Sequence, residues 1–102
     1  MKTQDYLSEL RSRYSISSAY AVAKLLGVSQ PSVGRYDKGI STFDDDVARR
    51  VAVLLDKHPA LVVLDMHMER AQNEETRSLW KEISAGFPAP LRIAKLGLYP
   101  RV

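Results

Sequence analysis

The 102-residue chain contains no cysteine. This absence excludes disulfide bonds, thiolate zinc sites and cysteine nucleophiles, and it agrees with the reducing environment of the cytoplasm. The sequence has no run of about 20 apolar residues, the length that crosses a membrane. The first nine residues include Asp5 and Glu9, where a signal peptide needs an apolar core. We therefore expect a soluble, cytoplasmic protein with no membrane partner.

The chain also has few groups arranged for catalysis. His58 and His67 lack the spacing of a two-histidine metal site on one helix turn, no serine stands in a nucleophile-elbow sequence, and no phosphate-binding loop is visible. The acidic run 44–46 stands where a helix is expected to begin, so we interpret it as capping rather than as a metal site. The sequence predicts no enzyme, no metal, no cofactor and no small-molecule substrate.

What the chain does contain is an ordinary globular composition, with 45% hydrophobic and 26% charged residues. Its length suits one compact domain. The net charge of +3 is distributed unevenly, because residues 1–40 and the tail 87–102 each carry +3 whereas residues 41–86 carry −3. A polyanion would therefore meet the first forty residues or the tail before the middle of the chain.

Apolar residues recur at intervals of three and four, which predicts amphipathic helices, and strand patterns are nearly absent. Hydroxyl, carboxylate, amide and proline residues mark the helix starts. We predict an all-α protein of five to six helices, with a core in 1–56, additional helices in 57–86 and a short arm in 87–102. The expected first residues or caps of the helices are Thr3, Ser18, Ser29, the run 41–46, Pro59 and Asn73.

The second and third predicted helices have the pattern of a helix-turn-helix. Ala23 is small enough for two helices to cross, Gly27 can take the left-handed conformation of a sharp turn, and Val33 and Tyr36 give the third helix an inner apolar face. Its outer face is left for DNA. An ordinary helical hairpin can share this pattern, but the spacing, capping and charge all favour the motif.

These residues, with Val28 and the exit 36–39, resemble the helix-turn-helix of Cro and the phage repressors, the XRE family, over about residues 1–56. The resemblance implies a lambda-repressor-like fold and a dimeric transcriptional regulator. The segment 64–71 followed by Trp80 is also similar to small helix-turn-helix regulators of filamentous phages and prophages. The chain differs from the family at Ala19, which replaces a phosphate-binding polar residue, and at Pro31 and Gly34, which replace side chains that face bases.

The positional match to the family also implies which side chains contact double-stranded DNA. Glutamine can bind adenine and arginine can bind guanine through two hydrogen bonds, whereas phosphate contacts position the protein without reading sequence. The residues expected at base edges are Gln30, Ser32 and Arg35, and those expected at phosphates are Ser18, Ser29 and Lys38.

The fifth and sixth predicted helices are apolar around more of their surface than one core contact needs, which predicts a homodimer. The expected dimer residues are Leu61, Leu64, Met68 and Trp80. The intervening polar residues Asp65, His67 and Glu69 are interpreted as a solvated face or as the rim of that contact. The alternative function is a protein-interaction module, such as an antitoxin-like or phage adaptor protein, in which these two helices bind another partner.

Overall fold

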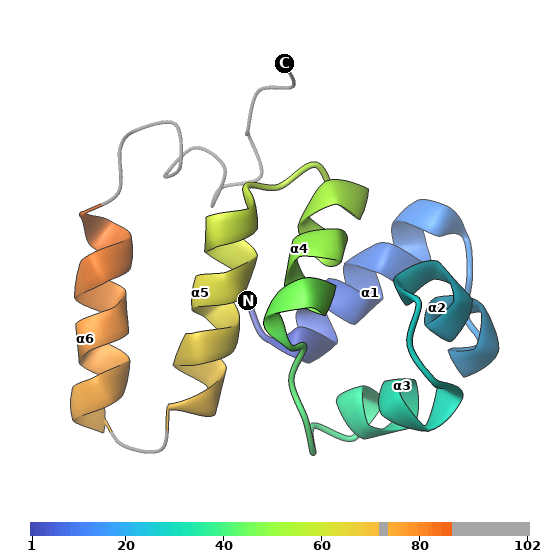
Figure 1. The fold of residues 1–102 in the computed structure, drawn as a ribbon, viewed down its shortest axis with the longest axis horizontal. Helices are drawn as coiled ribbons and strands as arrows, with labels where there is room; N and C mark the ends of the chain where they lie inside the picture. Colours follow the sequence, from blue (N-terminus) through green and yellow to red (C-terminus); the bar gives the residue numbers. More distant parts are fainter. Residues whose placement is uncertain (72–73, 87–102) are drawn as a thin grey trace.

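The computed structural model of the chain describes residues 1–71 and 74–86. These residues form helices without any strand, so the all-α prediction is confirmed. The elements are α1 (Thr3–Tyr14), α2 (Ala19–Leu26), α3 (Gln30–Asp37), α4 (Asp45–Leu54), α5 (Pro59–Arg70) and α6 (Glu74–Ala85). Figure 1 shows α1 to α4 gathered together, α5 beside α4, and α6 on the far side of α5. The expected cap Asn73 and the arm 87–102 lie outside the described residues.

Three of the helices begin at the caps that their sequences supply. The Ser18 hydroxyl accepts a hydrogen bond from the Ala21 amide at 3.0 Å, and the Ser29 hydroxyl accepts one from the Ser32 amide at 3.2 Å. Asp44 caps α4 in the same way, through the Val47 amide. Each cap satisfies an amide that has no partner within its own helix, which is worth about 1 kcal/mol.

The turn between α2 and α3 depends on Gly27. Its φ of 68° lies in the left-handed region, where residues with a Cβ are strained. This conformation ends α2 and lets the Val28 amide donate to the Ala23 carbonyl at 3.1 Å. Because only residues 27–29 separate the two helices, α3 is held close against α2.

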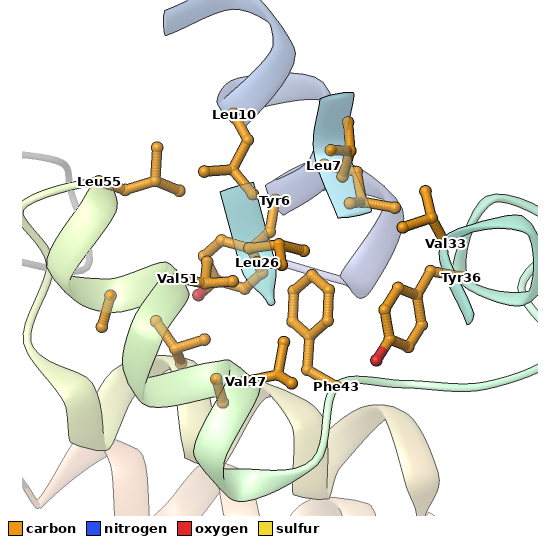
Figure 2. Packing of buried hydrophobic residues seen from close by; sticks show 14 of the residues in the cluster. Tyr6, Leu7, Leu10, Leu26, Val33, Tyr36, Phe43, Val47, Val51 and Leu55 are labelled. Carbon is orange, nitrogen blue, oxygen red and sulfur yellow. The ribbon is translucent and has the colours of Figure 1, made fainter. Parts of the chain in front are cut away.

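The core is built around Phe43, which comes from the connection between α3 and α4 and is fully buried. The Tyr36 ring meets the Phe43 ring edge-on at 5.0 Å between centroids, and Tyr6 lies on the other side at 6.5 Å. Aliphatic side chains from α1 to α4 surround these rings (Figure 2). The labelled members of this cluster are Leu7, Leu10, Leu26, Val33, Val47, Val51 and Leu55.

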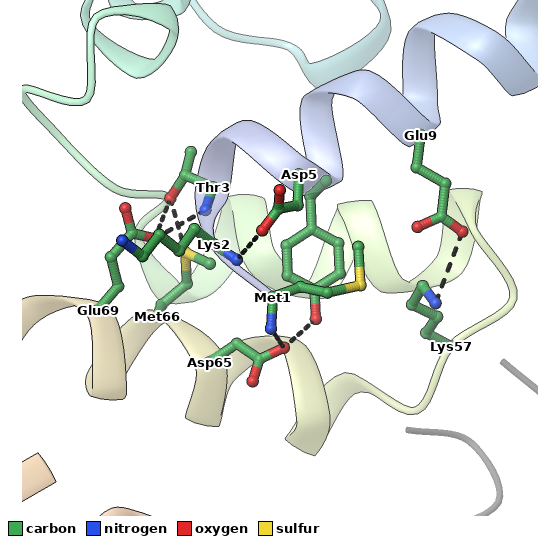
Figure 3. Close-up of polar contacts among 10 residues, drawn as sticks. Met1, Lys2, Thr3, Asp5, Glu9, Lys57, Asp65, Met66 and Glu69 are labelled. Carbon is green, nitrogen blue, oxygen red and sulfur yellow. Dashed lines mark hydrogen bonds and ion pairs between the residues drawn. The ribbon is translucent and has the colours of Figure 1, made fainter. Parts of the chain in front are cut away.

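The first turn of α1 is attached to α5 by polar contacts, most of them partly buried (Figure 3). Thr3 was expected to cap the helix, but Lys2 occupies the cap position and Thr3 is the fully buried first residue of the helix. The Thr3 amide and hydroxyl both donate to the Glu69 carboxylate, at 2.7 and 2.8 Å. The Thr3 hydroxyl also contacts the Met66 sulfur at 3.2 Å. Glu69 therefore completes the start of α1 instead of lying on a solvated face.

Asp65 makes the neighbouring contact, one turn earlier in α5. It accepts a hydrogen bond from the Tyr6 hydroxyl and pairs with the amino group of Met1 at 3.3 Å. Burial of Tyr6, and next its hydrogen bond to Asp65, raise the pKa of the Tyr6 hydroxyl well above its ordinary value. Asp65 and Glu69 thus join α5 to the start of α1.

The apolar surface of α5 is used inside the chain. Leu61 and Leu64 were expected at a dimer contact, but only 6% and 8% of their surfaces are exposed. The reason is that α5 packs against both α4 and α6, so it buries a wider part of its circumference than a helix with one neighbour. A partner chain cannot reach these two leucines without displacing part of the fold.

Candidate nucleic-acid interface

The eight-residue helix α3 divides its side chains between two faces. Val33 and Tyr36 are buried against the core. Gln30, Arg35 and Lys38 are exposed. The structure therefore places Gln30 and Arg35 on one short helix whose inner face is fixed by packing, and Lys38 directly after it.

Ser18 and Ser29 were expected both to cap helices and to contact phosphates, and the structure confirms the capping. The Ser18 and Ser29 hydroxyls both accept from main-chain amides within their helices. Each hydroxyl can still donate its own proton, which is the hydrogen bond that a phosphate oxygen would accept. Ser29 lies directly before α3 with the other candidates, whereas Ser18 stands apart at the beginning of α2.

Arg35 is connected to the start of α3 through two hydroxyl groups. Its Nη2 atom donates to the Ser32 Oγ at 3.0 Å, and the Ser32 and Ser29 hydroxyls lie 2.8 Å apart. Ser32 is half-buried, and Arg35 is exposed. Ser32 and Arg35 were both expected to contact bases, and in the protein without DNA they form a hydrogen bond with each other.

The end of α3 is held to α1 by an ion pair. The two terminal nitrogens of the Arg11 guanidinium donate to the two carboxylate oxygens of Asp37, at 2.7 and 2.9 Å. These hydrogen bonds lower the pKa of Asp37 and raise the pKa of Arg11. Arg11 also donates to the Ser17 carbonyl in the loop before α2. The Arg11 side chain therefore connects α1, this loop and the end of α3, next to the exposed Lys38.

Tyr20 and Lys24, which were not among the predicted site residues, form an exposed pair on α2. Tyr20 lies in the first turn of α2 with 59% of its surface exposed, and the Lys24 Nζ lies 5.5 Å from the centre of its ring. Their spacing of four residues on a helix was visible in the sequence. An exposed tyrosine with a lysine over its ring can offer a hydroxyl and a positive charge to an anion.

The predicted dimer residues do not form one exposed surface. Leu61 and Leu64 are buried, and Met68 and Trp80 are half-buried. The Trp80 ring stacks on the His67 ring with centroids 4.8 Å apart and an interplanar angle of 22°. Large exposed apolar side chains on α6 are instead Leu79 and Ile83, one helix turn apart, with 56% and 42% of their surfaces exposed.

Within residues 1–71 and 74–86, no group of three or more histidine, aspartate or glutamate side chains is placed to hold a metal ion. Nor is any helix in this part of the chain long and apolar enough to cross a membrane. Comparison of the chain with protein-family models, curated proteins and solved structures gives no match.

Proposed function

We propose that this protein is a sequence-specific DNA-binding transcriptional regulator, a repressor or Cro-like protein in which α2 and α3 act as a lambda-repressor-like helix-turn-helix. The observation that carries the proposal is that α3 has one buried and one exposed face. Val33 and Tyr36 pack its inner face into the core, whereas Gln30 and Arg35 are exposed and take no part in the core. Side chains of these two types can make paired hydrogen bonds to base edges.

The dimensions of α3 suit the major groove. With its side chains, an α-helix is about 10–12 Å in diameter, and α3 is about two turns long. The major groove of B-DNA is roughly 12 Å wide and admits an α-helix. A capped start, the ion pair at Asp37 and the short turn at Gly27 together fix the direction of α3, so its outer face can enter the groove without rearrangement of the core.

Fluorescence anisotropy with labelled duplexes tests this function. The preferred duplex is first selected from a random pool, and binding is then measured against an unrelated duplex over a series of salt concentrations. The affinity should fall steeply as salt rises, because each neutralised phosphate releases counterions. No binding of the wild-type protein to any duplex at low salt would overturn the proposal.

Three variants of α3 separate the roles of its side chains. Arg35→Ala and Gln30→Ala should weaken binding to the preferred duplex roughly 5- to 150-fold and binding to unrelated DNA much less. Lys38→Ala should weaken both alike and reduce the salt slope by about one. Arg49→Ala is the matched control, because Arg49 is exposed on α4 and pairs with Asp46. Equal losses on both duplexes for the three α3 variants would contradict base reading by α3.

We further propose that the regulator binds DNA as a homodimer. One short helix makes too few base contacts to select a single genomic site, and a two-fold dimer doubles them over half-sites about 34 Å apart. Leu79 and Ile83 are large apolar residues exposed one turn apart on α6, and we propose that they make this contact. The double variant Leu79→Glu with Ile83→Glu should lower both the molecular mass measured by analytical ultracentrifugation and the affinity for a palindromic site. The control Val53→Glu, at an exposed valine of α4, should lower neither.

The same two side chains favour the second candidate function, a protein-interaction module, if the partner of α6 is a different protein. In that case Leu79→Glu with Ile83→Glu would leave DNA binding and the mass of the isolated protein unchanged. The dimer proposal would then be overturned, whereas DNA binding by α3 would stand.

A further inference from the structure

The guanidinium of Arg35 is connected to the main chain of α3 by a continuous series of hydrogen bonds. Arg35 donates to the Ser32 hydroxyl at 3.0 Å, and the Ser32 and Ser29 hydroxyls are 2.8 Å apart. The Ser29 hydroxyl in turn accepts from the Ser32 amide at 3.2 Å. Since Ser29 is the cap of α3, the series ends on a group that is fixed by the helix itself.

Each hydrogen bond in this series can be assigned one donor and one acceptor. Arginine only donates, so the Ser32 oxygen accepts from Arg35 and its proton can be donated to Ser29. The Ser29 oxygen then accepts from both the Ser32 hydroxyl and the Ser32 amide, using its two lone pairs. One terminal nitrogen of Arg35 is therefore held along α3, and the planar guanidinium is limited in the directions it can face.

A side chain held in this way loses less conformational entropy when it binds. A solvated arginine populates many rotamers, and fixing them opposes association. Guanine recognition requires two parallel hydrogen bonds to its O6 and N7 atoms, so it depends on the orientation of the guanidinium plane as well as on its charge. Attraction to a phosphate depends much less on that orientation.

We propose that Ser32 is a positioning residue that orients Arg35 to bind a guanine in the major groove, and that Ser29 holds Ser32 in place. The inference rests on the proposed function and deepens it. It replaces the direct base contact expected of Ser32 with an action through Arg35. It also gives the Ser29 hydroxyl a second role beside capping.

A double-mutant cycle tests the action of Ser32 through Arg35. In the full-length protein, Ser32→Ala should lower the affinity for the selected duplex about 3- to 10-fold, the value of one lost hydrogen bond. Binding to unrelated duplex and the salt slope should not change, because no charge is lost. In the Arg35→Ala background the same substitution should have no further effect. Ser32→Thr, which keeps the hydroxyl, should restore most of the affinity.

The base is tested by replacing each guanine of the selected duplex with 7-deazaguanine, which lacks the N7 acceptor. One position should weaken wild-type binding and leave Arg35→Ala binding unchanged, and at that position Ser32→Ala should cause no additional loss. Ser12→Ala, at an exposed serine of α1, controls for the change of residue type. Melting curves of all variants ensure that binding is compared between folded proteins.

The outcomes separate this inference from the proposed function. If the wild-type protein binds no duplex, the proposed function fails. If Arg35→Ala loses specific binding but Ser32→Ala binds as the wild type does, only the positioning role of Ser32 is overturned. If Ser32→Ala weakens binding equally with and without Arg35, Ser32 contacts the DNA directly and the inference is likewise overturned.

Discussion

Two glycines of the α2–α3 unit allow one substitution to be tested in two backbone conformations. Gly27 forms the turn with a φ of 68°, and Gly34 lies within α3. Neither position is crowded. A Cβ at Gly27 would lie 3.7 Å from the Arg50 guanidinium, an ordinary contact, and a Cβ at Gly34 would have no atom within 4 Å. The backbone conformation therefore decides the effect of an added methyl group.

The two alanine variants should change stability in opposite directions. Gly34→Ala removes the entropic cost of a glycine within a helix and should raise the free energy of unfolding by about 0.5–1 kcal/mol. Gly27→Ala forces an L-residue into the left-handed region, at a cost of about 1–2 kcal/mol, which the reduced freedom of the unfolded chain offsets by roughly 0.4–1 kcal/mol. The net loss at Gly27 is about 1 kcal/mol.

Thermal and urea unfolding followed by circular dichroism measure both effects. For a domain of this size, 1 kcal/mol shifts Tm by roughly 4–8 °C, so the two variants should lie on opposite sides of the wild type and be clearly resolved. Gly27→Asn is a useful third variant, because asparagine tolerates the left-handed region better than alanine. A Gly27→Ala protein as stable as the wild type, or a destabilised Gly34→Ala protein, would refute this account of the turn and of α3.

Three further outcomes follow from the contacts around α5. Thr3→Val removes the hydroxyl that donates to the Glu69 carboxylate and should lower the free energy of unfolding by about 1–3 kcal/mol in urea titrations. Because the pKa of Tyr6 is higher in the folded chain than in the unfolded one, stability should fall as pH rises above about 10. Tyr6→Phe should reduce that slope without abolishing it, because burial also raises the pKa of Tyr36. His67→Ala uncovers one face of Trp80, the chain's only tryptophan, so its fluorescence should shift to longer wavelength, whereas replacing the other histidine should leave the spectrum unchanged.

The helix boundaries could be predicted where the signal is local. Ser18, Ser29 and Gly27 act within a few residues of their own positions, and the structure confirms the cap or turn expected of each. The prediction that Thr3 caps the first helix was wrong, because the partner of Thr3 is Glu69, which is 66 residues away in the sequence. A capping pattern shows which residue can satisfy an amide, but it does not show that a distant carboxylate does so instead.

Burial on α5 was harder to predict for a related reason. The spacing of apolar residues shows how wide an apolar surface is, but not whether the chain or a partner covers it. Leu61 and Leu64 were assigned to a partner, and the structure buries them within the chain. Charged substitutions at these positions would therefore measure folding rather than assembly.

For the candidate interface, the sequence indicated the residue types but not their mutual arrangement. Gln30, Arg35 and Lys38 were expected to face DNA, and the structure exposes the first two on α3 and Lys38 directly after it. The hydrogen bond from Arg35 to Ser32 depends on one rotamer of each side chain, which periodicity does not specify. The exposure of Tyr20 was not predicted, because an aromatic residue near apolar neighbours is more often part of a core.

The form of α3 implies that folding and recognition depend on different side chains of the same helix. Val33 and Tyr36 are buried, so truncating either one should lower stability by creating a cavity and should reduce DNA binding only through loss of the folded protein. Gln30 and Arg35 are exposed and lie outside the core cluster, so their alanine variants should melt close to the wild type and still lose specific binding. A variant of Arg35 that lost affinity and stability together would show that its guanidinium supports the fold, and base recognition would then have to rest on Gln30.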